Sequence, residues 1–157
     1  MAYLMNQDRC MNPRPVSFLN EIEGLQRGLI LQVTGMAKNN IWLAGADDFE
    51  AYKVVLAPAG ADKHDLIIHS TVPNQYDERL MEADFVLKAN EIGRGHYITE
   101  GDEVTFAKEM VAGDLVVGAE VELAGNGQLK VGAGAPLGEV IRIYNFNGQE
   151  SVMIRFY

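Results

Sequence analysis

Residues 101–157 read GDEVTFAKEMVAGDLVVGAEVELAGNGQLKVGAGAPLGEVIRIYNFNGQESVMIRFY, and this stretch decides the predicted fold. Short runs of apolar and β-branched residues alternate there with glycine-containing turns at nearly regular intervals. Short strands with frequent turns are typical of a barrel or sandwich, whereas βαβ units need helical segments between their strands. We therefore predict that residues 101–157 form a compact β-barrel subunit.

Two Asn-Gly dipeptides in this stretch predict tight hairpins, because a type I′ turn needs positive φ angles at both of its central residues. Asn126-Gly127 separates residues 120–123 from 128–131, and Asn147-Gly148 precedes a closing strand at residues 151–157. Strand alternation assigns the side chains of that closing strand to two faces. One face takes Val152, Ile154 and Phe156, and the other takes Met153, Arg155 and Tyr157.

The rest of the chain extends the same pattern, so the predicted fold class is mainly β, a small barrel or sandwich with short helical turns. We expect residues 17–157 to form a single β-rich domain, preceded by an extended N-terminal arm at residues 1–16. A short helix is predicted where Ser17 can cap an apolar repeat of helical spacing. The predicted elements upstream of residue 101 are this helix at 17–26, strands at 28–33, 47–56 and 65–72, a strand or extended link at 84–88, and a loop at 89–96.

The arm at residues 1–16 contains Pro13 and Pro15, which disfavour a continuous helix and favour an extended path. Two interpretations remain open. The segment is either a frayed terminus, or an arm whose apolar side chains fill grooves on a neighbouring subunit. The apolar residues concerned are Tyr3, Leu4, Met5 and Met11.

Charge and cysteine content narrow the class of protein. The formal net charge is −9, whereas binding a nucleic-acid backbone needs a basic footprint. Cys10 is the single cysteine, so no intrachain disulfide is expected and synthesis in a reducing cytoplasm is predicted. The acidic charge makes nucleic acid an unexpected partner. We find neither a secretory signal nor an apolar run long enough to cross a membrane, so a membrane is not an expected partner either.

The sequence offers no arrangement typical of catalysis, and we predict no catalytic, cofactor or metal residues and no enzymatic activity. A phosphate-binding loop needs Gly-Lys-Ser/Thr at the start of a helix, and the glycine-rich stretch 125–138 lacks it. The histidines are scattered and have no cysteine cluster or HExxH motif beside them. His69 is expected to be a hydrogen-bonded strand residue and His96 a loop residue, while Ser70 and Cys10 lack the setting of a nucleophile.

Two segments resemble small structural proteins encoded in the head gene clusters of tailed bacteriophages. Residues 91–107, EIGRGHYITEGDEVTFA, contain an Arg-Gly-(His)-Tyr step, interrupted by His96, followed by the Gly101-Asp102 turn. Residues 112–141 contain a second turn, Gly113-Asp114, and a small-residue loop that leads into Leu137-Gly138-Glu139-Val140. The resemblance to this capsid decoration, or cement, family extends over about residues 28–157 and implies a protein that binds the outside of an icosahedral capsid.

The function predicted from this resemblance is that of a virion structural protein, made in the host cytoplasm, that stabilises the capsid surface by bridging capsomers. The major capsid protein is the expected partner, and a homo-oligomer, with a trimer favoured, is the expected state. Alternatives are another head or tail protein with the same barrel, or a non-viral module that binds carbohydrate or protein. The candidate partner-binding residues are Tyr3, Leu4, Met5, Met11, Met153, Arg155 and Tyr157.

Overall fold

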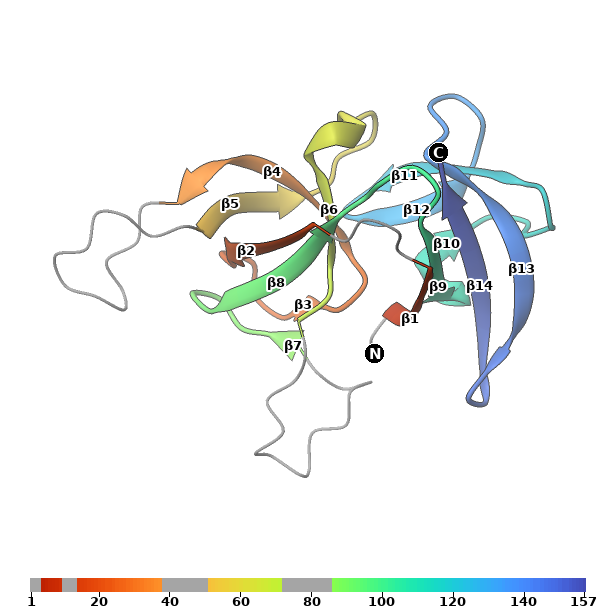
Figure 1. Ribbon diagram of the computed structural model, residues 1–157, viewed down its shortest axis with the longest axis horizontal. Coiled ribbons are helices and arrows are strands. Elements are labelled where there is room, and N and C mark those ends of the chain that lie inside the picture. Colours follow the sequence, from red (N-terminus) through yellow and green to blue (C-terminus); the bar gives the residue numbers. More distant parts are fainter. Residues whose placement is uncertain (1–3, 10–13, 38–50, 72–85) are drawn as a thin grey trace, which may run out of the picture.

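The structure, a computed structural model, describes residues 4–9, 14–37, 51–71 and 86–157 (Figure 1). These residues form mainly β-strands, which confirms the predicted fold class, with short 3-10 turns between some of them. The turns are η1 (Lys63–Asp65) and η3 (Lys108–Met110). The strands are β1 (Leu4–Arg9), β2 (Pro15–Leu19), β3 (Leu25–Gln26), β4 (Ile30–Ala37), β5 (Ala51–Leu56), β6 (Leu66–His69), β7 (Val86–Leu87), β8 (Ile92–Tyr97), β9 (Glu103–Ala107), β10 (Val111–Ala112), β11 (Glu120–Gly125), β12 (Gln128–Val131), β13 (Gly138–Phe146) and β14 (Gln149–Phe156).

The first lobe is a closed barrel with strand order β2-β5-β4-β6-β8. It closes because β2 pairs in parallel with β5 on one edge and antiparallel with β8 on the other. Apolar side chains fill the interior, and the small β3–β7 pair packs against them through Leu25 and Leu87. The barrel contributes Val16, Phe18, Leu31, Val54 and Ile67 to this core.

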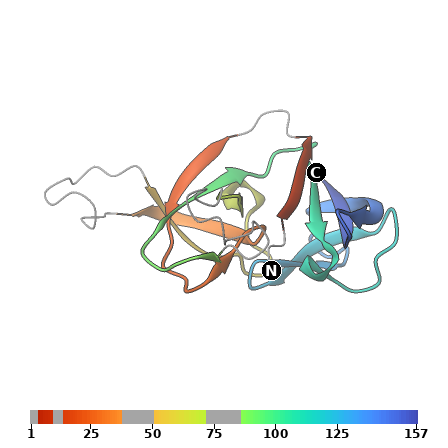
Figure 2. The same cartoon turned by 90° about the horizontal axis from the view of Figure 1, so that it is seen from below.

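The second lobe is a seven-stranded sheet with the order β1-β9-β14-β13-β11-β12-β10. Figures 1 and 2 show it beside the barrel as a strongly curved sheet. β9 leads directly through η3 into β10, which lies at the far edge of the sheet, and η3 also contacts β12 and β14. The sheet therefore wraps its apolar face around a core that includes Phe106, Leu129 and Ile154.

Both Asn-Gly turns form the predicted hairpins. Asn126 and Gly127 have φ values of 52° and 73°, and Asn147 and Gly148 have values of 51° and 85°. The registers Gly125↔Gln128 and Phe146↔Gln149 leave only those dipeptides as loops. Positive φ at both central residues defines a type I′ turn, whose twist matches that of the paired strands.

The two lobes share apolar packing and backbone hydrogen bonds. Ile30, Leu66 and Ile68 of the barrel belong to the same buried cluster as the inner face of the seven-stranded sheet. At the tip of the β11–β12 hairpin, the Ile30 N–H donates to the Gly127 carbonyl at 2.9 Å, and the Gly127 N–H donates to the Ala57 carbonyl at 3.2 Å. The hairpin tip is therefore held between two strand ends of the barrel.

The position of the barrel corrects the sequence prediction. Residues 101–157 form the curled sheet, while the closed barrel is built from strands between Pro15 and Tyr97. The sheet is open, with β1, paired to β9, at one edge and β10 at the other. This pairing also corrects part of the predicted arm, since residues 4–9 are a strand of the sheet in their own chain.

Two local predictions are wrong as well. Residues 17–26, predicted as a helix, contain the end of β2 and the strand β3. Residues 89–96, predicted as a loop, contain most of β8. In β8 the glycines are needed for packing, because a Cβ on Gly93 would lie 2.4 Å from the Phe18 ring, which fills the barrel.

Candidate protein-binding face

The sequence-predicted binding residues fall into two groups, which the structure places in different parts of the second lobe. Met153, Arg155 and Tyr157 lie at β14, on the side of the sheet that faces away from the core. Leu4 and Met5 belong to β1, at the edge of the same sheet and separated from β14 by β9. Tyr3 and Met11 lie outside the described residues.

Burial along β14 confirms the predicted alternation of its side chains. Val152 and Ile154 are fully buried in the core, and Phe156 is 1% exposed. Met153 is half-buried and Arg155 is exposed, as expected for the opposite face of the same strand. The outer side of β14 is therefore a surface of the molecule. The neighbouring strand β13 contributes further side chains to it.

A β-bulge in β13 brings three further side chains onto this outer side. Val140 pairs with Ile154, but the next pair is Arg142↔Met153, so Ile141 is the extra residue. An extra residue reverses the alternation of every side chain that follows it. As a result Arg142 lies on the outer face, opposite Met153. Tyr144 and Phe146, at every second position after Arg142, lie on the same face.

These side chains hold one another in place. The Arg142 guanidinium carbon lies 4.1 Å from the centre of the Tyr144 ring, a cation–π distance. Tyr144 meets Phe146 edge to face, with ring centres 6.2 Å apart. The Tyr144 hydroxyl and the Thr105 Oγ1 are 2.7 Å apart, which fixes the ring over β9. We call Arg142, Tyr144, Phe146 and Met153 the aromatic face.

The opposite end of the same surface is occupied by internal polar contacts. Arg155 lies 3.3 Å from a Glu103 oxygen and 3.6 Å from a Glu139 oxygen. The Tyr157 hydroxyl donates to Glu120 at 3.2 Å. Desolvation, followed by the Glu120 carboxylate, raises the pKa of Tyr157 above its ordinary value. Arg155 and Tyr157 therefore have partners within the chain, and the aromatic face is the better candidate for an outside partner.

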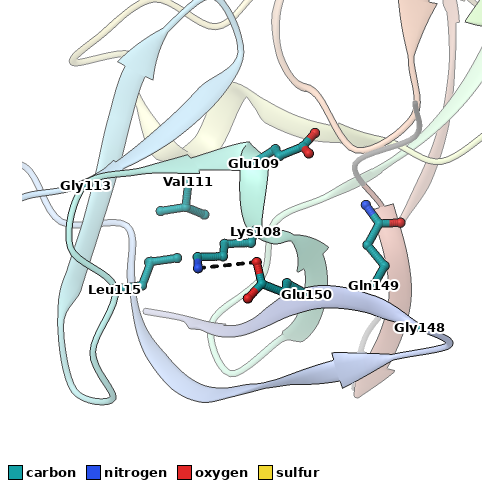
Figure 3. A pocket seen from close by; sticks show the side chains of 8 residues that line it. All are labelled: Lys108, Glu109, Val111, Gly113, Leu115, Gly148, Gln149 and Glu150. Atoms are coloured by element: carbon teal, nitrogen blue, oxygen red, sulfur yellow. Dashed lines mark hydrogen bonds and ion pairs between the residues drawn. The ribbon is translucent and has the colours of Figure 1, made fainter.

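An open hollow of about 460 Å³ lies at the tip of the β13–β14 hairpin (Figure 3). Its walls come from η3, from the loop that follows β10, and from the first residues of β14. Lys108 and Glu150 form an exposed ion pair at 3.5 Å across it. Such an exposed pair contributes little free energy, and the pair gives the hollow no net charge of its own. The lining residues are Lys108, Glu109, Val111, Gly113, Leu115, Gly148, Gln149 and Glu150.

His69 has a structural role, as the sequence predicts. Its ring is fully buried, with Nδ1 2.8 Å from the Gln26 carbonyl oxygen and Nε2 2.8 Å from the Thr71 Oγ1. The ring meets Phe18 edge to face at 5.6 Å. Burial lowers the pKa of His69 to about 4, and the hydrogen bond to Gln26 opposes this only partly. We assign the neutral tautomer in which Nδ1 donates to Gln26 and Nε2 accepts from Thr71.

Ser70 and His96 form a partly buried polar contact, and His96 lies on β8 instead of in the predicted loop. The Ser70 Oγ and the His96 Nδ1 are 2.6 Å apart. Burial lowers the pKa of His96, and the Asp102 carboxylate opposes that shift. A nucleophilic serine must reach its substrate, but Ser70 is only 7% exposed. We therefore interpret the contact as a link between β6 and β8.

The third histidine, His64, lies in η1, where its backbone N–H donates to the Asp62 side chain at 3.0 Å. Across residues 4–9, 14–37, 51–71 and 86–157, no group of three or more histidine, cysteine or acidic side chains is placed to hold a metal ion. Within the same ranges, no helix has the length and apolar content needed to cross a bilayer.

The small-residue loop at residues 132–136 is organised by one carboxylate. Glu122 accepts a hydrogen bond from the Ala135 N–H at 2.9 Å and pairs with the Lys130 ammonium at 3.2 Å. The hydrogen bond from Ala135, and then that from Lys130, holds the pKa of Glu122 below its ordinary value. The glycines of this stretch therefore lie in a turn whose backbone is bound by the Glu122 carboxylate.

We expect this loop to loosen in acid and in the Glu122→Gln variant. A carboxyl group with a lowered folded-state pKa contributes its stabilisation above the ordinary glutamate range, and the contribution is lost as pH falls through the folded pKa. Amide hydrogen exchange at Ala135, followed by NMR, should accelerate several-fold in Glu122→Gln at neutral pH. Glu139→Gln is the control, because Glu139 pairs with Arg155 and not with the loop. Equal acceleration in both variants would contradict the assignment.

Of the four residues of the aromatic face, the sequence predicted only Met153 on β14 and not the three residues on β13. The missed residues Arg142, Tyr144 and Phe146 do alternate in the sequence, but the bulge that turns them outward carries no local signal. In comparisons with known proteins, the sequence matches no protein-family model and no curated protein.

Proposed function

We propose that this chain is a virion structural protein that binds the outer surface of an icosahedral phage capsid and stabilises it by bridging capsomers. The proposal assigns the chain a binding role and no catalytic role. The major capsid protein is the proposed partner, and the capsid surface of the virion is the proposed location. A homo-oligomer, with a trimer favoured, is the proposed state on the lattice.

The observation that supports a binding role best is the composition and order of the aromatic face. Tyr, Phe, Met and Arg are enriched in protein–protein interfaces, while Lys and Glu are depleted. Arg142, Tyr144, Phe146 and Met153 provide this set on neighbouring strands, and mutual contacts already hold the rings. Because the side chains are ordered before binding, little conformational entropy is lost when a partner covers them.

The choice of a capsid as partner is supported by the resemblance of residues 91–107 and 112–141 to decoration proteins. A repeating lattice also suits a modest contact surface. When copies of an oligomer bind repeated sites together, the effective concentration of the later contacts strengthens attachment without a larger interface. A face built on one hairpin therefore suits decoration of a repeating lattice.

The test is co-sedimentation with expanded heads assembled from the major capsid protein of the same gene cluster. We expect the wild-type chain to sediment with the heads in a saturable, stoichiometric manner. Phe146→Ala should weaken the apparent Kd about tenfold or more, because buried aromatic contacts are frequent interface hot spots. Arg142→Ala should weaken it less, since it removes a charge at the margin of the face.

Val55→Ala is the matched control, because Val55 is also apolar and 41% exposed but lies on the barrel strand β5. All variants must retain the thermal unfolding midpoint of the wild type before their binding is compared. Equal weakening by Val55→Ala, or full binding by Phe146→Ala, would exclude the aromatic face as the contact. Absence of wild-type co-sedimentation would exclude the proposed function.

A further inference from the structure

β13 extends well beyond the strand beside it. It runs over Gly138–Phe146, but β11 pairs only with its first two residues. Val140 adds two hydrogen bonds to the preceding turn, because its N–H donates to the Ala119 carbonyl and its carbonyl accepts from the Gly118 N–H. From residue 141 to residue 146, no strand among the described residues pairs with the edge of β13 that faces away from β14.

The backbone groups on this edge can be assigned from the hairpin register. In an antiparallel pair, opposed residues alternate between pairs that exchange both hydrogen bonds and pairs that exchange none. The two-residue turn closes on the hydrogen-bonded pair Phe146↔Gln149, so Tyr144↔Ser151 is the next hydrogen-bonded pair. The N–H and C=O groups of Ile143 and Asn145 therefore point away from β14.

Natural sheets protect such edges with lysine, proline, short strands or covering segments. Residues 141–146 read IRIYNF, which contains neither lysine nor proline. Apolar side chains also stay exposed beside this edge. Ile143 is 41% exposed. Val116 and Val117 are 61% and 66% exposed, and they lie in the turn whose Gly118 N–H donates to the Val140 carbonyl. This edge therefore has backbone N–H and C=O groups that point away from β14, and exposed apolar side chains lie beside it.

The charge at this edge indicates which kind of segment fits. Arg142 is exposed and contacts the Tyr144 ring, and no carboxylate of the described residues forms an ion pair with it. A partner with an acidic side chain beside Arg142 would supply the missing opposite charge. A second copy would not, because antiparallel pairing through Ile143 and Asn145 places Arg142 opposite the Phe146 of that copy.

We propose that the edge of β13 at residues 141–146 accepts an extended segment of the capsid lattice protein as an additional strand. The acidic side chain of this segment pairs with Arg142, and an alternate apolar side chain packs near Ile143 and Val116. Backbone hydrogen bonds to Ile143 and Asn145 supply affinity, and the side chains on each face supply specificity. The identity of the partner rests on the proposed function, whereas the strand-accepting edge itself does not.

The experiment uses the full-length ¹⁵N-labelled chain and two capped hexapeptides, one alternating Glu with Val and the other alternating Lys with Val. At millimolar Glu–Val peptide, we expect the amides of Ile143 and Asn145 to shift and to exchange several-fold more slowly. The Glu–Val peptide should bind about threefold tighter than the Lys–Val peptide, the size expected for one exposed ion pair. Arg142→Glu should reverse that preference while leaving the backbone edge intact.

Ile143→Pro tests the backbone contact, because it removes an outward N–H that β14 does not use and so should abolish peptide binding. Ile143→Thr is its control, since threonine keeps the N–H and suits a strand. The proposal is overturned if neither peptide binds, or if the amide signals of Ile143 and Asn145 do not shift on binding. It is also overturned if the two peptides bind with the same affinity both to the wild type and to Arg142→Glu. Concentration-dependent protection of these amides without peptide would identify a second copy as the occupant instead. Since no capsid is used, this result is independent of the co-sedimentation test.

Discussion

Gly127→Ala is expected to lower the free energy of unfolding by about 3 kcal/mol. A Cβ at this position would lie 2.7 Å from the Ile30 carbonyl oxygen, a backbone atom that cannot rotate away. The φ of 73° adds a strain of about 1 kcal/mol for a residue with a side chain. Displacing the hairpin tip also weakens two hydrogen bonds to the barrel, at Ile30 and Ala57, each contributing about 1 kcal/mol. Urea unfolding measures the loss.

Gly148→Ala is the matched control for this prediction. Gly148 occupies the same position of a type I′ turn, with a φ of 85°, but no other atom lies within 4 Å of the Cβ it would gain. It should therefore cost only the backbone strain, about 1 kcal/mol. If the two variants lost equal stability, the turn geometry alone would explain both results, and the contact between the lobes would contribute nothing measurable.

The second large effect is a loss of about 3 kcal/mol of stability as the pH falls from 6.5 to 4, caused by His69. Burial lowers the folded-state pKa of this ring from 6.5 to about 4. The unfolded chain therefore binds the proton first, and stability falls by about 1.4 kcal/mol per pH unit between these two values. The contribution is complete above pH 6.5, and below pH 4 no further loss comes from this group.

Urea unfolding at several pH values, for the wild type and for His69→Gln, isolates this contribution. Glutamine can still donate to the Gln26 carbonyl but cannot ionise, so the variant should be less stable at pH 7 and lose less stability below it. Carboxylates and His96 titrate in both proteins, and the difference between the two profiles removes their contribution. Parallel profiles would show that His69 is not the group responsible.

The features that the sequence predicted correctly depend on neighbouring residues. Asn126-Gly127 and Asn147-Gly148 each specify a turn by their own backbone preferences, and the hairpins follow from the apolar runs beside them. The two faces of β14 follow from strand alternation in a strand that lies over one core. The mainly β fold class follows from many such local signals along the chain.

The features that the sequence missed depend on residues far apart in the chain. The barrel closes through the parallel pairing of Phe18 with Tyr52, and neither residue marks that contact locally. The helical spacing at residues 17–26 comes from apolar residues that belong to separate strands, β2 and β3. The bulge at Ile141 reverses the alternation in β13, so uninterrupted strand periodicity would turn Arg142 and Tyr144 toward the core.

The pairing of β1 with β9 imposes an order on folding during synthesis. β1 covers Leu4–Arg9 and β9 covers Glu103–Ala107, so every barrel strand lies between them in the sequence. Closing a loop on the order of a hundred residues costs about 3 kcal/mol more entropy than closing a two-residue turn. During synthesis, which proceeds from the N-terminus, every barrel strand is made before β9. β1 therefore cannot pair with β9 until the whole barrel has been synthesised.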